Sequence, residues 1–83
     1  DRQRFPLLGL AIQSLRTGGT APAAYNAANE VAVEAFLNEH ITFFKIPQIV
    51  EQTLEQLDHR DPTDLSAVIS HDAEARRLAS SLL

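Results

Sequence analysis

An alanine-rich stretch from Gly18 to Leu37 constrains the fold of this 83-residue chain more than any other feature. Its first two residues, Gly18 and Gly19, are expected to end one helix, because glycine readily adopts the left-handed conformation that closes a helix. Thr20 is the expected N-cap of the next helix, and Pro22 suits its first turn, where a missing N–H costs nothing. The stretch therefore predicts a helix end and a helix start within a few residues.

The helix that follows, predicted over residues 23–38, is expected to be the central helix of a small bundle. Apolar side chains cover nearly its whole circumference, and only a narrow polar stripe of Asn26, Glu30 and Glu34 interrupts them. A helix of this kind is buried by neighbours on several sides, and small side chains let those neighbours approach closely. The face expected to pack against them consists of Ala24, Ala28, Val31, Ala32 and Ala35.

Two further helices are predicted from apolar residues at helical spacing. One spans residues 5–17, and the other, with Pro47 in its first turn, spans residues 46–57. The inward face of the first is expected to comprise Leu8, Ala11, Ile12 and Leu15, widened by Leu7 and Leu10. The inward face of the other is expected to comprise Ile46, Ile49, Val50, Thr53, Leu54 and Leu57.

The connector at residues 40–44 is too short to assign as a strand. We expect it to tuck Ile41 and either Phe43 or Phe44 under the ends of the helices that it joins. A polar turn that contains a proline, at residues 58–63, separates the third helix from the last one.

The last predicted helix spans residues 65–82. Asp72 falls where a continuous helix would place an apolar residue, so we expect a kink or break near Ser70–Asp72. The alternative is a continuous helix in which Asp72 pairs with Arg76, one turn further on. Four helical segments joined by short connections predict an all-α, four-helix bundle-like domain that spans residues 1–83.

Composition and charge narrow the classes of function. The chain carries 7 basic and 11 acidic residues, for a net charge of −4, and its basic residues are scattered apart from the pair Arg76-Arg77. Binding to a phosphate backbone requires a basic patch, so no nucleic-acid partner is expected. No apolar run approaches the roughly 18 residues of a membrane span, so no membrane partner is expected. The absence of cysteine excludes disulfides and thiolate chemistry.

The start of the chain bears on whether it is an independent gene product. The sequence contains no methionine, begins with Asp1, and shows its apolar pattern almost at once, from Phe5. An independent gene product ordinarily begins with methionine or with a small residue exposed by its removal. We therefore expect this chain to be a segment of a longer protein rather than a trimmed independent one.

The three histidines form no recognisable metal or catalytic motif. His40, His59 and His71 are never four residues apart, and no His-Glu-x-x-His pattern occurs. All three lie in or beside predicted turns. Solvated or helix-capping roles are therefore expected for them.

Two pairs of glutamates lie one helical turn apart, Glu30 with Glu34 and Glu51 with Glu55. Such pairs can hold a metal in the core of a bundle, but a di-metal carboxylate site adds a Glu-x-x-His motif from facing helices. That motif is absent from the sequence, and both pairs lie on polar stripes. We interpret them as solvated helix faces.

The remaining polar candidates are equally weak. Gly18-Gly19-Thr20 could cradle an anion at a helix N-terminus, but no strand precedes it and no lysine follows, so a helix boundary is the favoured interpretation. No serine lies in a Gly-x-Ser-x-Gly motif. Asn26 and Asn29 are poor helix formers, and we expect structural hydrogen bonds to a loop or another helix, with substrate contact as the functional alternative. The residues by themselves indicate no catalytic, cofactor-binding or metal-binding group.

Residues 18–37 resemble the signature of the C-terminal helical domain of the 1-deoxy-D-xylulose 5-phosphate reductoisomerases. The shared pattern is Gly-Gly-Thr-Ala-Pro followed by Asn-Ala-Ala-Asn-Glu-Val-Ala-Val-x-Ala-Phe-Leu. The likeness continues on both sides, in Phe5-Pro6 with Leu10-Ala11, in Ile41-x-Phe43-x-x-Ile46, and in Asp72-Ala73-x-Ala75-Arg76. One departure is Lys45, which stands where the family usually has an aspartate that caps the third helix. The capping of that helix is therefore in doubt.

The resemblance implies a three-part enzyme of which this chain is the C-terminal part. An N-terminal domain binds NADPH, and a central domain holds a divalent metal (Mg²⁺ or Mn²⁺), the substrate and a catalytic flap. The family converts 1-deoxy-D-xylulose 5-phosphate to 2-C-methyl-D-erythritol 4-phosphate in the non-mevalonate isoprenoid pathway. The resemblance also implies a homodimeric enzyme, located in the bacterial cytoplasm or, for a plant-type protein, in the plastid.

The family's metal ligands, phosphate-binding residues and flap lie upstream of this segment, so the resemblance assigns no catalytic, cofactor-binding or metal-binding residue to it. The chain is expected to be a non-catalytic structural domain that packs on the central domain. Without that domain, its contact surface would be exposed, and we expect the isolated chain to self-associate. The alternative is a standalone helical module whose apolar face docks a partner helix.

Overall fold

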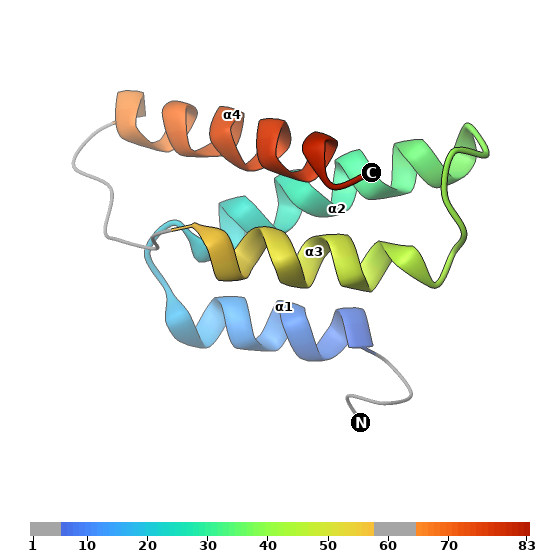
Figure 1. The fold of residues 1–83 in the computed structure, drawn as a ribbon. Helices are drawn as coiled ribbons and strands as arrows, with labels where there is room; N and C mark the ends of the chain where they lie inside the picture. The colour runs from blue at the N-terminus through green and yellow to red at the C-terminus, as the bar shows by residue number, and fades with distance from the viewer. Residues whose placement is uncertain (1–5, 58–64) are drawn as a thin grey trace.

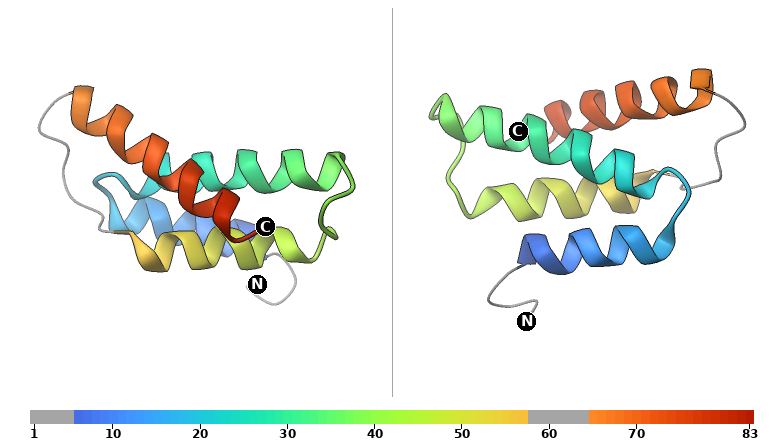
Figure 2. Two further views of the ribbon diagram at one scale, coloured as in Figure 1. Left: turned by 45° about the horizontal axis from the view of Figure 1, so that its top comes forward. Right: turned by 180° about the vertical axis from the view of Figure 1, so that it is seen from behind.

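The computed structural model describes residues 6–57 and 65–83. These residues form four helices, α1 (Pro6–Thr17), α2 (Ala21–Leu37), α3 (Lys45–Gln56) and α4 (Leu65–Ser81), and no strand occurs among them. The predicted all-α fold is therefore confirmed. Helices α2 and α3 lie at the centre, with α1 packed along one side of them and α4 along the other (Figure 1). Helix α4 crosses α2 obliquely (Figure 2).

The junction between α1 and α2 follows the predicted glycine stop. Gly18 and Gly19 have φ angles of 73° and 57°, in the left-handed region. The Gly18 N–H donates to the Ser14 carbonyl at 3.0 Å, and the Ala21 N–H donates to the Gly18 carbonyl at 3.0 Å. A Cβ at position 18 would meet no atom within 4 Å, so backbone conformation and not space favours glycine there.

Thr20 occupies the N-cap position of α2, but its side chain makes no capping hydrogen bond, contrary to the sequence prediction. Its backbone has φ −88° and ψ −1°, whereas a capping residue normally takes extended angles. The second residue of α2 is Pro22, which has no N–H for a cap to accept. The Thr20 side chain is instead buried, at 6% exposure.

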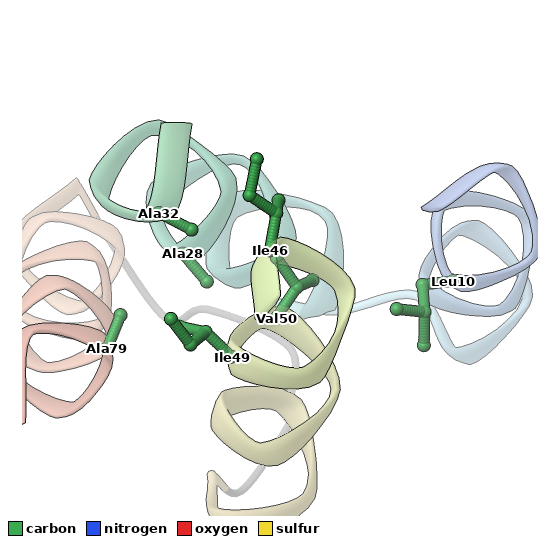
Figure 3. Packing of buried hydrophobic residues seen from close by; sticks show 7 residues of the cluster. All are labelled: Leu10, Ala28, Ala32, Ile46, Ile49, Val50 and Ala79. Atoms are coloured by element: carbon green, nitrogen blue, oxygen red, sulfur yellow. The ribbon is translucent and has the colours of Figure 1, made fainter. Parts of the chain in front are cut away.

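Helix α2 is the central helix, as its composition predicts, and it contacts α1, α3 and α4. Its buried side is made of alanines alone: Ala21, Ala24, Ala27, Ala28, Ala32 and Ala35. Figure 3 shows Ala28 and Ala32 pointing into the space between α3 and α4, toward Ile49 and Ala79. The absence of larger side chains on this face lets the helix backbones approach closely.

The C-terminal end of α2 closes without a glycine. Glu39 takes the left-handed conformation at φ 62°. Its N–H donates to the Phe36 carbonyl at 3.0 Å, and the His40 N–H donates to the Ala35 carbonyl at 2.8 Å. This is the hydrogen-bond pattern of a Schellman motif, in which glycine usually takes the left-handed position. The sequence carries no visible signal for it.

Helix α3 supplies the largest buried side chains, Ile49, Val50 and Thr53. Ile46 is buried as well, while Leu54 and Leu57 are half-buried, so the predicted inward face of α3 is confirmed. The Thr53 hydroxyl donates to the Ile49 carbonyl at 2.8 Å, which satisfies its hydrogen-bonding capacity within the core.

The start of α3 has no side-chain cap, in agreement with the departure noted at Lys45. The first turn is closed by the backbone instead: the Lys45 N–H donates to the Thr42 carbonyl at 3.1 Å. In the preceding connector, Ile41 packs against the core as predicted. Phe43 and Phe44 are both exposed, so the prediction that one of them would be tucked in is wrong.

Helix α4 is continuous, so the predicted kink or break near Ser70–Asp72 is wrong. The alternative holds: the Asp72 carboxylate accepts a hydrogen bond from the Arg76 Nε at 2.8 Å. The side chain of Asp72 remains partly exposed, so the helix continues without burying an unpaired charge. The inward face of α4 consists of Ala75 and Ala79.

Candidate functional site

Arg76 forms one ion pair within α4 and a second that joins α4 to α2. Its Nε donates to the Asp72 carboxylate at 2.8 Å, and its Nη2 donates to the Glu30 carboxylate at 2.6 Å. These hydrogen bonds, the one to Asp72 first and the one to Glu30 second, raise the pKa of Arg76. All three side chains are partly exposed, and exposed ion pairs stabilise a fold by only about 0–1 kcal/mol each. The arrangement serves to hold two helices together.

The four glutamates that could have held a metal are all exposed, as expected for solvated faces, and Glu30 in addition pairs with Arg76. Glu51 and Glu55 border a cleft of about 340 Å³ between α1 and α3. Its other lining residues are Leu10, Gln13, Ser14, Thr17, Ala21 and Leu54. Across residues 6–57 and 65–83, no three histidine, aspartate or glutamate side chains lie close enough together to share a metal ion.

The two described histidines differ in position. His40 lies in the turn after α2 and is exposed, as predicted. His71 lies inside α4 and is half-buried, contrary to the prediction that it flanks a turn, because α4 does not break there. His59 lies outside the described residues.

The two asparagines of α2 also differ in their exposure to solvent. Asn26 is exposed on the polar stripe, whereas Asn29 is half-buried. The Oδ1 atom of Asn29 is buried and has no hydrogen-bond partner in the described part of the chain. The structural hydrogen bond predicted for these asparagines is therefore not present at that atom.

Tyr25 ties α1 to α2 in a way that sequence reasoning missed. Its hydroxyl donates to the Leu7 carbonyl at 3.2 Å, across 18 positions of sequence. Burial raises the pKa of this hydroxyl above its ordinary value of 10.0. A tyrosine amid alanines on a central helix is the one visible signal, since a buried tyrosine needs a partner for its hydroxyl.

The outer face of α1 is the largest correction to the sequence analysis. Leu8, Ile12 and Leu15, which were expected to face the core, are 56%, 42% and 70% exposed. Their spacing of four and three residues aligns them along one side of the helix, and we call them the α1 stripe. The core side of α1 is formed by Leu10 and Ser14, with Leu7 packed beside them. Figure 3 shows Leu10 directed toward α3.

None of the helices in residues 6–57 and 65–83 is long and apolar enough to cross a membrane. Residues 1–78 match the protein family described as the DXP reductoisomerase C-terminal domain. The chain belongs to this family. The resemblance drawn from the motif at residues 18–37 is thereby confirmed.

Individual members of the family agree with this assignment over the whole chain. The chain is 48% identical over 83 residues to the 1-deoxy-D-xylulose 5-phosphate reductoisomerase of Acinetobacter baumannii, of which it covers 21%. It is 53% identical to that of Burkholderia multivorans, with the same coverage. It also resembles the solved reductoisomerase of Zymomonas mobilis in complex with NADPH, with a TM-score of 0.92 and 48% identity. That comparison covers 99% of this chain and 22% of the Zymomonas chain. The chain thus spans about a fifth of the length of its relatives.

Proposed function

We propose that this chain is the C-terminal helical domain of a 1-deoxy-D-xylulose 5-phosphate reductoisomerase, and that its own role is structural. The observation that carries the proposal is the match over the full chain, at 48% identity, to about a fifth of each relative. In this proposal, residues 1–83 are one domain of a longer polypeptide. The preceding domains bind NADPH and a divalent metal, Mg²⁺ or Mn²⁺, and convert 1-deoxy-D-xylulose 5-phosphate to 2-C-methyl-D-erythritol 4-phosphate.

The finer features of the whole enzyme belong to the same proposal. The Zymomonas relative was solved with NADPH, which supports NADPH as the cofactor of the longer protein. The Acinetobacter and Burkholderia relatives come from bacteria, which favours the bacterial cytoplasm over a plastid. A homodimeric whole enzyme completes the proposal.

A binding and turnover experiment tests the structural role. We expect the 83-residue chain to show no saturable binding of NADPH or Mg²⁺ by calorimetry, and no NADPH oxidation with 1-deoxy-D-xylulose 5-phosphate. The full-length chain should turn over. Saturable NADPH or Mg²⁺ binding by the 83-residue chain would contradict a purely structural role.

The coding sequence upstream of Asp1 separates this proposal from the standalone interaction module. A reductoisomerase predicts a glycine-rich dinucleotide fingerprint roughly 300 residues upstream. A module predicts an open reading frame that starts close to Asp1. The module hypothesis retains one supporting observation, the exposed α1 stripe, which would then face an independent partner.

A further inference from the structure

Helix α1 is anchored to the rest of the bundle by few buried side chains. It contacts α2 and α3 and, among the described residues, makes no contact with α4 (Figure 1). Of its described side chains, Leu10 and Ser14 are buried. The Ser14 hydroxyl donates to the Ala11 carbonyl of the same helix at 2.8 Å, so this bond does not join α1 to a neighbour. The apolar anchor of α1 is therefore Leu10, with Leu7 packed beside it.

The contact between α1 and α3 is incomplete. An open cleft of about 340 Å³ lies between the two helices, and Leu10 and Leu54 are among the residues that line it. Well-packed interiors leave few voids larger than a water molecule. The two helices therefore share only part of their facing surfaces.

A hydrogen bond fastens the N-terminal end of α1 to α2. The Tyr25 hydroxyl donates to the Leu7 carbonyl at 3.2 Å, and Tyr25 also packs against the cluster that contains Leu10. The bonded residues are 18 positions apart in the sequence, so the bond exists only while α1 lies against α2. We call it the Tyr25 latch, because α1 must break it to move away.

The other end of α1 meets α2 at the glycine pair. Gly18 and Gly19 take left-handed φ angles of 73° and 57°, and a Cβ at position 18 would meet no atom within 4 Å. Glycine has the widest range of backbone conformations of any residue. Dihedral changes at these two residues can therefore turn α1 away while α2, α3 and α4 keep their mutual contacts.

We infer that α1 is a separately opening unit of this domain, hinged at Gly18–Gly19 and held closed by the Tyr25 latch. The inference concerns this chain alone and does not depend on the proposed function. The open state leaves the core between α2, α3 and α4 in place and exposes the part of it that Leu10 covers.

Opening has a measurable consequence for the backbone of α1. The helix has 12 residues, one of them Gly9 in its interior. Isolated helices shorter than about 12–15 residues are marginal in water, and an interior glycine weakens them further. An undocked α1 therefore loses its helical hydrogen bonds, and its amide protons exchange with solvent.

Hydrogen exchange of individual amides in the 83-residue chain, followed by NMR, tests the inference. Relative to unfolded-chain rates, we expect the amides of residues 10–17 to exchange at least about tenfold faster than those of Val50 and Thr53 in α3. They should share one denaturant dependence, as a unit that opens together does, whereas fraying of a helix end would not produce this. Protection should rise between Gly18 and Ala28. Equal protection of α1 and α3 would overturn the inference, because α1 would then open only when the whole domain unfolds.

Tyr25→Phe tests the latch, since it removes the hydroxyl and keeps the ring. The amides of α1 should exchange about two- to tenfold faster, as expected for the loss of one hydrogen bond. The slowest amides of α3 should accelerate by the same factor, because the latch is also broken in the unfolded domain. Unchanged exchange in α1 would overturn the role of Tyr25.

Ala75→Gly separates the opening of α1 from unfolding of the whole domain. Ala75 of α4 is fully buried and packs with Ala24 and Ala27, and these contacts remain when α1 opens. Glycine is unfavourable in a helix interior, so the slowest amides of α3 should exchange at least about fivefold faster. The amides of α1 should keep their original rates. Equal acceleration in α1 and α3 would overturn separate opening.

Discussion

Two isoleucines show how differently the inner and outer sides of this bundle are used. Ile49 of α3 is 1% exposed and packs between α2 and α4, whereas Ile12 of α1 is 42% exposed and does not belong to the buried core. Both obey helical spacing within an apolar pattern. The difference teaches that such a pattern marks a side to be buried, but not whether the domain itself provides the cover.

The inner side is also unusual in how it is filled. The fully buried side chains of α2 are all alanines, and those of α4 are Ala75 and Ala79. Helix α3 provides the bulk, through Ile46, Ile49 and Val50. The core therefore has one side where helix backbones approach closely and one that is filled by large side chains. Enlarging a side chain should destabilise the first side, and truncating a side chain should destabilise the second.

The largest expected effect comes from truncating the two isoleucines in turn. Ile49→Ala should lower the free energy of unfolding by about 2–5 kcal/mol, because it removes buried methylene groups and leaves a cavity. Ile12→Ala in the dilute 83-residue chain should cost clearly less, about 1 kcal/mol, since 42% of Ile12 is already exposed. Chemical denaturation measures both. Equal losses would mean that the outer side of α1 is buried after all.

Enlarging an alanine on the inner side should come next in size. Ala28→Leu or Ala32→Leu should overpack the contact of α2 with α3 and α4 and cost about 1–3 kcal/mol. Ala73→Leu, at an exposed position of α4, is the control and should stay within about 0.5 kcal/mol. Unchanged stability of the α2 variants by denaturation would show that the alanine face is loosely packed.

The tie between α1 and the core can be tested through Tyr25. Tyr25→Phe removes the hydrogen bond to the Leu7 carbonyl and should cost about 0.5–1.5 kcal/mol at neutral pH. Burial raises the pKa of Tyr25, so above about pH 10 the unfolded chain loses this proton before the folded chain does. The contribution is complete below pH 10 and is lost as pH rises through the raised pKa. The stability difference between the two proteins should therefore shrink in alkaline solution, and a constant difference would speak against the buried hydroxyl.

The smallest effect is expected at the exposed ion pairs of α4. Arg76→Gln breaks the contacts with Asp72 and Glu30 and should cost up to about 1 kcal/mol at low salt. Arg77→Gln is the matched control, since among residues 6–57 and 65–83 Arg77 pairs within its own helix, with Glu74 at 3.5 Å, and should cost at most about half as much. Denaturation at low and high salt measures both. A loss at Arg76 that high salt leaves unchanged would not be electrostatic in origin.

Local signals predicted the helices well. The glycine pair before α2 and the unbroken apolar spacing of α3 located both elements, because each depends on neighbours in sequence. The prediction failed at Asp72, where a polar residue on an apolar face suggested a break. A salt bridge to Arg76 one turn away, extended to Glu30 on another helix, resolves that conflict within a continuous α4. Only the first of those partners could be named from the sequence.

The candidate site residues also divide into those whose exposure the sequence predicted and those whose exposure it did not. The exposed positions of the paired glutamates and of His40 followed from their places on polar stripes and in a turn. The inward side of α1 did not, because six apolar residues cover more than half of that helix and leave two possible orientations. The choice between Leu10 and Ile12 as the core residue is made by contacts with α2 and α3, which lie far along the chain.

By itself the sequence determined the fold class, the alanine-lined central helix and the family, since all three are written in local spacing and in one long motif. Only the tertiary structure decided which side of α1 meets the core, where Thr20 places its side chain, and that α4 runs unbroken. The physical reason is common to all three: each depends on a balance between burial and pairing with residues distant in sequence, and local pattern contains no information about those partners. Among the described residues, the α1 stripe is one of several apolar surfaces left exposed, together with Leu65 and Ile69 of α4 and with Phe43 and Phe44.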